Sequence, residues 1–72
     1  MEEIDFVQLI EVVSESDPGS LTLDSKLEDF GWDSLAVISL ISELDRIGGY
    51  SISADSVASA ATVRDLFESA FS

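Results

Sequence analysis

The segment that most constrains the fold is residues 34–47, SLAVISLISELDRI, in which apolar residues recur at helical spacing. A β-strand would need strict alternation of apolar and polar residues, which this segment lacks. Asp33 or Ser34 is a natural N-cap for a helix here, and Gly48-Gly49 is a natural stop. The sequence therefore predicts an amphipathic helix with a broad apolar face. That face comprises Leu35, Val37, Ile38, Leu40, Ile41, Leu44 and Ile47.

Two further helices are predicted from the same kind of spacing. The first spans about residues 3–15 and ends before Asp17-Pro18-Gly19-Ser20, because Pro and Gly interrupt helices. The last begins at Thr62, which forms a capping box with Asp65 three residues on. Their apolar faces consist of Phe6, Leu9, Ile10 and Val13 in the first helix and of Val63, Leu66, Phe67 and Ala70 in the last.

Residues 16–33 form a long connection whose apolar residues should be pinned onto the core. A short helix over residues 54–59, capped by Ser53 and with Val57 facing inward, completes the expected elements. The fold class is therefore all-α: a small antiparallel four-helix bundle of three main helices and one short helix, with a long first loop. At 72 residues the chain is long enough for one core only, so we expect a single domain over residues 1–72.

The composition excludes most enzyme classes. The chain contains no Cys and no His, so a Ser-His-Asp triad, a Cys-His pair and a His-based zinc site are all impossible. An EF-hand starting at Asp24 also fails, because its third position is Lys26 and its sixth is Asp29. We therefore expect no catalytic residue and no metal site, and a protein that is not an enzyme.

The charge balance points to basic partners. Fifteen acidic residues face three basic ones, giving a net charge of −12, and residues 1–33 hold ten of these acids against one Lys. Such a chain repels nucleic-acid phosphate and anionic membranes, so we expect neither as a partner. No basic leader and no apolar run of membrane-spanning length is visible, which favours a cytoplasmic protein. We expect a monomer.

A serine stands where the long connection enters the best-defined helix, in Phe30-Gly31-Trp32-Asp33-Ser34-Leu35. Its hydroxyl should be exposed there, and the unpaired N–H groups of the first helical turn favour an anion such as a phosphate ester. Asp33 offers a carboxylate to the metal or base of an enzyme that modifies the serine. The simpler interpretation is that Ser34 only caps the helix, since the chain has thirteen serines.

The complete motif resembles a known pattern. Gly31-Trp32-Asp33-Ser34-Leu35 resembles the Gly-x-Asp-Ser-Leu phosphopantetheine-attachment motif of the acyl carrier protein family. The resemblance extends over essentially the whole chain and includes the spacing from Ser34 to Thr62-Val63. Three further segments carry it: Leu27-Glu28-Asp29-Phe30-Gly31, Ile52-Ser53-Ala54-Asp55 and Thr62-Val63-Arg64-Asp65-Leu66.

The resemblance implies a carrier function. A phosphopantetheinyl transferase would attach 4'-phosphopantetheine from coenzyme A covalently to Ser34, and the thiol of that arm would hold acyl groups as thioesters. The implied partners are acyl ligase, acyltransferase or ketosynthase enzymes with basic docking surfaces, in a fatty-acid, polyketide or other specialised pathway. The implied residues for motif and partner recognition are Gly31, Asp33, Leu35, Glu43 and Asp45.

Several residues depart from the family pattern. Ala36 and Ser39 stand where acids are frequent, Ser42 where a larger apolar residue is frequent, and Arg46 where an acid is frequent. Residues 34–47 consequently carry a net charge of only −1. These departures indicate a carrier dedicated to one pathway with matched enzymes, because charge differences at an interface rim give specificity.

Two alternative functions stay open, and one group of residues could line either an acyl pocket or the core. The chain is also compatible with a peptidyl or aminoacyl carrier, or with an acidic helical interaction module whose Ser34 is never modified. Trp32 could be an exposed contact for a partner or for the arm. The favoured interpretation is that it folds back on the connection and pins it, and Tyr50 is expected to be half-buried. Some family members hold the acyl chain between helices, although a plain core would show the same pattern. The candidate lining residues are Ile41, Leu44, Ile52, Val57, Ala60 and Ala61.

Overall fold

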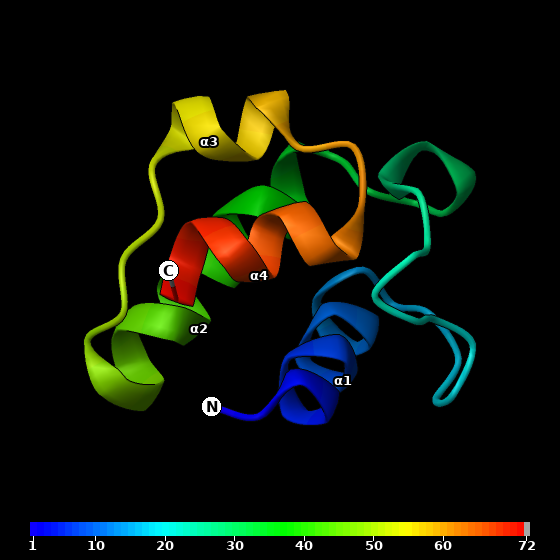
Figure 1. The fold of residues 1–72 in the computed structure, drawn as a ribbon, viewed down its shortest axis with the longest axis horizontal. Coiled ribbons are helices and arrows are strands. Elements are labelled where there is room, and N and C mark those ends of the chain that lie inside the picture. Colours follow the sequence, from blue (N-terminus) through cyan, green and yellow to red (C-terminus); the bar gives the residue numbers. More distant parts are fainter. Residues whose placement is uncertain (72) are drawn as a thin grey trace.

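The computed structural model describes residues 1–71, and its regular elements are helices (Figure 1). The helices are α1 (Glu3–Val13), α2 (Ser34–Gly48), α3 (Ala54–Ser59) and α4 (Val63–Phe71), and a 3-10 turn η1 (Leu27–Asp29) interrupts the long first loop. In Figure 1, α4 crosses in front of α2, with α1 below them and α3 above. The predicted bundle of three main helices and one short helix is confirmed. No helix within residues 1–71 is long and apolar enough to cross a membrane.

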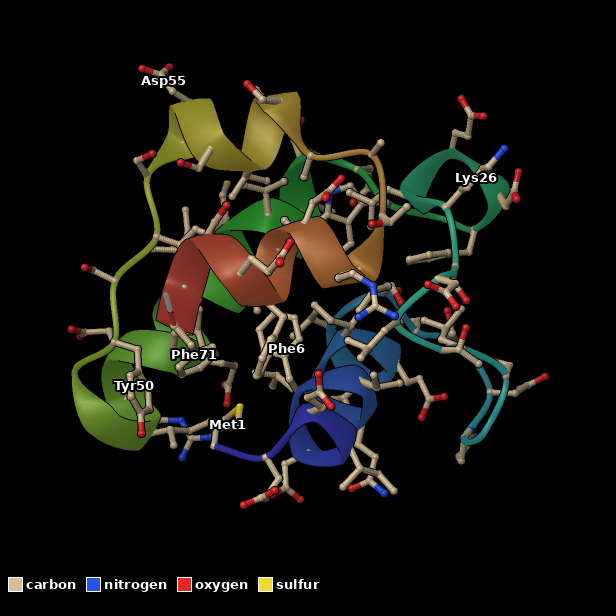
Figure 2. The ribbon with its side chains drawn as sticks, in the orientation of Figure 1. Met1, Phe6, Lys26, Tyr50, Asp55 and Phe71 are labelled. Atoms are coloured by element: carbon tan, nitrogen blue, oxygen red, sulfur yellow. The ribbon has the colours of Figure 1, made fainter. Side chains whose placement is uncertain are left out.

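The core is built from α1, α2 and α4. The largest fully buried side chains are Phe6, Ile10, Leu40, Leu44, Val63 and Leu66. An aromatic cluster closes one side of this core. The Phe6 ring lies edge-on to those of Phe67 and Phe71, with centroid distances of 5.3 and 5.8 Å. Tyr50 is half-buried, as predicted, and its ring lies 4.7 Å from that of Phe71 (Figure 2). These contacts join α1, α4 and the link after α2.

The helix ends follow the predicted capping chemistry. Thr62 Oγ1 accepts the N–H of Asp65 at 3.3 Å, and Asp65 Oδ2 accepts the N–H groups of Ala61 and Thr62 at 2.9 and 3.2 Å. These donors, that of Ala61 first, lower the pKa of Asp65 because they stabilise its charged form. Ser53 caps α3 by accepting the N–H of Ser56, and α2 stops at Gly49, whose φ of 70° is left-handed.

The first helix is shorter than predicted, because it ends at Val13 rather than near residue 15. Glu15 adopts a left-handed φ of 58°, so the N–H of Ser16 bonds the carbonyl of Glu11 and the N–H of Glu15 bonds that of Val12. This is the hydrogen-bond pattern of a Schellman motif. It is built here without the glycine that usually signals it in a sequence, which explains why the helix end was misplaced.

The broad apolar face of α2 is buried only in part. Leu35 and Ile38 are 73% and 61% exposed and Ile47 is also exposed, whereas Ala36 is buried. The buried stripe of α2 is narrow, since Ala36, Leu40 and Leu44 repeat every four residues on one side. A domain with so few helices covers only one side of α2, so part of its apolar arc stays in contact with water.

The long first loop is fixed to α4, as its apolar residues predicted. Three backbone hydrogen bonds join residues 23–27 to residues 61–64, with N···O distances of 3.0, 3.1 and 2.8 Å. Lys26 and Thr62 form an isolated antiparallel bridge at this junction. Leu27 is buried in the core. At the other end of the loop, the buried carboxylate of Glu11 accepts the N–H of Leu21 at 3.0 Å. The loop is therefore anchored to both α1 and α4.

Candidate functional site

Ser34 is the first residue of α2, and its side chain is exposed. Asp33 provides the N-cap: its Oδ1 accepts the N–H of Ala36 at 3.0 Å, and its carbonyl accepts the N–H of Val37 at 3.1 Å. The sequence left open whether Asp33 or Ser34 caps the helix, and the structure assigns that role to Asp33. The Ser34 hydroxyl is consequently available for chemistry at the helix start.

The backbone around Ser34 favours an anion. The N–H groups of Ser34 and Leu35 lie ahead of the first bonded turn and have no acceptor within α2. They carry the partial positive charge of the helix N-terminus, which stabilises a phosphate ester attached at this point. Asp33 is exposed beside Ser34 and keeps a carboxylate oxygen outside the capping bond. Within residues 1–71 no cluster of three or more acidic residues is arranged to hold a metal ion.

A hollow of about 470 Å³ opens beside Ser34, between α2, α3 and the end of the long loop. We call it the Ser34 hollow. Most of its wall is apolar, with carboxylates at Glu28 and Asp33. The lining residues are Leu27, Glu28, Trp32, Asp33, Ser34, Val37, Ala54, Val57, Ala58 and Ala60.

Trp32 borders the Ser34 hollow and also packs on the loop. Its side chain is half-buried, and its ring lies edge-on to that of Phe30 with a centroid distance of 6.3 Å. The predicted pinning of the loop by Trp32 is therefore confirmed. Trp32 and Ser34 line the same hollow.

The residues predicted to line an acyl pocket are divided among different environments. Val57 and Ala60 border the Ser34 hollow. The other four lie elsewhere: two are buried in the core, one packs half-buried against it, and one is exposed in a neighbouring hollow. Leu44 and Ile52 are the two buried residues, and Ile41 is the half-buried one. Ala61 is exposed and borders the neighbouring hollow. Ala54 and Ala58 of α3 also line the Ser34 hollow and were not predicted to do so. Their spacing of four residues is the only sign of this in the sequence.

The predicted recognition residues differ in their exposure and partners. Gly31, Asp33 and Leu35 are exposed around Ser34, and Asp45 is exposed further along the helix. Glu43 is half-buried and forms an ion pair with Arg46, which raises the pKa of that guanidinium. Its charge is therefore partly neutralised. A Cβ added at Gly31 would meet no atom within 4 Å, so space alone does not require glycine there.

Comparison with known proteins identifies a family that the chain matches. A protein-family model described as a phosphopantetheine attachment site matches residues 5–69, which include all of α2 and α3 and most of α1 and α4. No curated protein and no solved structure matches the chain.

Proposed function

Because the chain belongs to the phosphopantetheine-attachment family, whose domains carry 4'-phosphopantetheine covalently, we propose that Ser34 is the attachment residue. The observation that carries this assignment is the exposed Ser34 hydroxyl at the start of α2, freed from capping by Asp33. In the modification, the Ser34 hydroxyl gives up its proton and forms a phosphodiester with the pantetheine phosphate of coenzyme A. The nucleotide part of coenzyme A leaves.

The residues around Ser34 fit the group. The N–H groups of Ser34 and Leu35 would stabilise the phosphodiester, and the Ser34 hollow offers an apolar wall along which an attached chain can lie. The attached arm supplies a terminal thiol, a group that this Cys-free chain lacks. Asp33 would serve the transferase that makes the bond, by offering its carboxylate to that enzyme's metal ion or base.

We further propose that the protein carries an acyl group as a thioester and delivers it to the enzymes of one biosynthetic pathway. Domains of this family are non-catalytic carriers that meet a modifying enzyme and several biosynthetic enzymes. Tethering raises the concentration of the acyl group at each partner's active site without any chemistry by the carrier. The low net charge of residues 34–47 supports enzymes matched to this carrier, because a surface that differs in charge selects different partners. We expect a monomer that acts in the cytoplasm.

The test of Ser34 is the intact mass of the protein before and after incubation with coenzyme A, magnesium and a broad-specificity phosphopantetheinyl transferase. We expect the wild type to gain one phosphopantetheine group and Ser34→Ala to gain none. Ser53→Ala is the matched control, since Ser53 also stands at the start of a helix, and it should be modified like the wild type. No gain in a folded wild type, with a dedicated transferase tried as well, would favour the interaction-module interpretation.

The apolar wall of the Ser34 hollow favours an acyl cargo over a charged aminoacyl one. Trp32 reports on this directly, because it is the only tryptophan and it borders the hollow. Loading the arm with a medium-length acyl chain should shift Trp32 emission to shorter wavelength relative to the unloaded arm. An aminoacyl load that produces the larger shift would contradict the proposal.

A further inference from the structure

A strip of exposed apolar residues runs from the neighbour of Ser34 onto α1. Ile4, Val12 and Leu35 are 66%, 74% and 73% exposed, and Ile38 follows Leu35 one turn along α2. We call Ile4, Val12, Leu35 and Ile38 the apolar strip. Isolated apolar residues on a surface are ordinary, but contiguous ones mark interaction sites.

Two hollows connect Ile4, Val12 and Leu35 of the strip. The loop after α1 returns beside that helix (Figure 1). One hollow, of about 370 Å³, lies between this loop and α1, and Ile4 and Val12 line it from the helix. The other, of about 610 Å³, lies between the end of α1 and α2, and Val12 and Leu35 line it together. Its charged lining consists of Glu15 and of the ion pair between Glu43 and Arg46. Val12 belongs to both, so the first hollow, which we call the α1 groove, continues to Leu35, the neighbour of Ser34.

The α1 groove is preformed. Half-buried Val7 and Leu21 contribute to its walls from α1 and from the loop. The buried Glu11 holds the loop in place, because its carboxylate accepts the N–H of Leu21 at 3.0 Å and its carbonyl accepts the N–H of Ser16 at 2.8 Å. A ligand entering this groove therefore would not have to order the loop first, which lowers the cost of binding.

Acidic residues are sequence neighbours of the residues that line the groove. Asp5 follows Ile4, and Glu15 and Asp17 stand on either side of Ser16; all three acids are exposed. Residues 1–33 together carry a net charge of −9. Lys26, the one basic side chain of this half, lies beside η1 and points outward, away from α1 (Figure 2). A second copy of the chain would bring another net charge of −12 to this surface, and an anionic membrane would be repelled in the same way. The charge selects a basic occupant.

We propose that the apolar strip and the α1 groove are the docking surface for a segment of a partner enzyme that carries apolar side chains flanked by Lys or Arg. This inference rests on the proposed function, because the partner is an enzyme that acts on the group attached to Ser34. A segment seated in the groove and extending past Val12 reaches Leu35, which brings the enzyme to the attachment residue. The acidic first half, rather than α2, then selects the partner.

The test is a titration of the isotope-labelled protein with a synthetic amphipathic peptide of Leu and Lys, followed by amide chemical shifts. A peptide with Glu in place of each Lys is the control. We expect saturable shifts at Ile4, Gln8, Val12 and Leu21 with the basic peptide and none with the acidic one. Shifts confined to other surfaces, or equal responses to both peptides, would overturn the proposal.

Three variants test whether the peptide binds the apolar strip itself and not any exposed apolar side chain. Ile4→Ser and Val12→Ser should each weaken peptide binding by about tenfold, since each removes an apolar side chain from the contact. Ile47→Ser, an equally simple change at an exposed apolar residue near the end of α2, should leave the affinity unchanged. Equal weakening by all three would refute the assignment. All three side chains are exposed, so circular dichroism should show an intact fold.

Two further measurements test peptide docking independently of the attachment at Ser34. Ser34→Ala should bind the peptide like the wild type, whereas failure of the mass gain at Ser34 would refute the attachment site and leave the peptide result untouched. Sedimentation of the protein alone tests the other occupant. A dimer that Val12→Ser disrupts would show that a second copy covers the strip, and would overturn the proposal.

Discussion

Two substitutions can separate the two roles of Asp33, which are capping α2 and offering a carboxylate to the transferase. Its carboxylate caps α2 through the bond to the N–H of Ala36, and it also stands exposed next to Ser34 for use by a transferase. Asp33→Asn retains an oxygen that can accept the Ala36 N–H but removes the charge. Asp33→Ala removes both. The pair therefore distinguishes the hydrogen bond from the carboxylate.

The expected magnitudes follow from the capping geometry. Loss of an N-cap acceptor costs about 1 kcal/mol, and Asn and Asp are nearly equal as caps. Asp33→Ala should therefore lower the free energy of unfolding by about 1 kcal/mol, and Asp33→Asn by only a few tenths. In a domain of this size, 1 kcal/mol corresponds to a fall in the melting temperature of about 4–8 °C. The effect should be global, because α2 supplies Leu40 and Leu44 to the core.

The assay combines thermal unfolding with the rate of phosphopantetheine transfer. We expect Asp33→Asn to melt close to the wild type and yet to lose at least about tenfold in kcat/KM for the transferase, or about 1.4 kcal/mol of transition-state stabilisation. Asp33→Ala should lose both properties. Asp55→Asn is the matched control, since Asp55 is an exposed acid in the first turn of α3 that does not cap it, and neither measurement should change.

Two results would refute this reasoning. If Asp33→Asn melts as early as Asp33→Ala, the charge at the helix start and not the hydrogen bond stabilises α2. If Asp33→Asn is modified at the wild-type rate, the carboxylate has no part in the transfer reaction, and the proposal for Asp33 must be withdrawn.

Three further predictions concern stability. Leu44→Ala should reduce the free energy of unfolding in urea by about 2–5 kcal/mol, because this side chain is fully buried; a loss below 1 kcal/mol would contradict its core position. Folding lowers the pKa of Asp65, so the carboxylate's contribution to stability is complete above its unfolded pKa near 3.8 and is lost as the pH falls through the lower folded pKa. The difference in unfolding free energy between the wild type and Asp65→Asn should therefore shrink below about pH 4. A difference that stays constant with pH would refute this. Glu11→Ala should cost about 1–3 kcal/mol by leaving the Leu21 N–H without its acceptor, whereas Glu11→Gln should cost much less; equal losses in urea unfolding would show that the charge matters more than the bond.

Much of the fold could be predicted from local sequence patterns, because each helix carries its own start or stop signal. The capping box at Thr62 and Asp65, the Ser53 cap and the Gly48-Gly49 stop all occur where local chemistry predicted them. The end of α1 could not be predicted in the same way. Its terminating residue is Glu15, and no local rule anticipates a glutamate in a left-handed conformation.

The site was predictable in part for a similar reason. The position of Ser34 at the start of α2 follows from the motif and the helix pattern, and the structure confirms it. The wall of the Ser34 hollow depends on how α3 and the loop meet, which periodicity does not encode. The exposure of Leu35 and Ile38 could not be predicted either, because a wide apolar arc does not indicate which of its residues will pack against other elements.

The bonds between residues 23–27 and residues 61–64 have a consequence for the timing of synthesis. The segment that leads into Ser34 is held by backbone groups almost forty positions further along the chain. A ribosome that has made α1 and α2 has therefore produced the serine but not residues 61–64, which fix the loop before it. Contacts of such long sequence separation also form late in refolding, since the intervening chain must first be closed into a loop. A transferase that needs the ordered loop would thus modify only chains in which α4 has already been made.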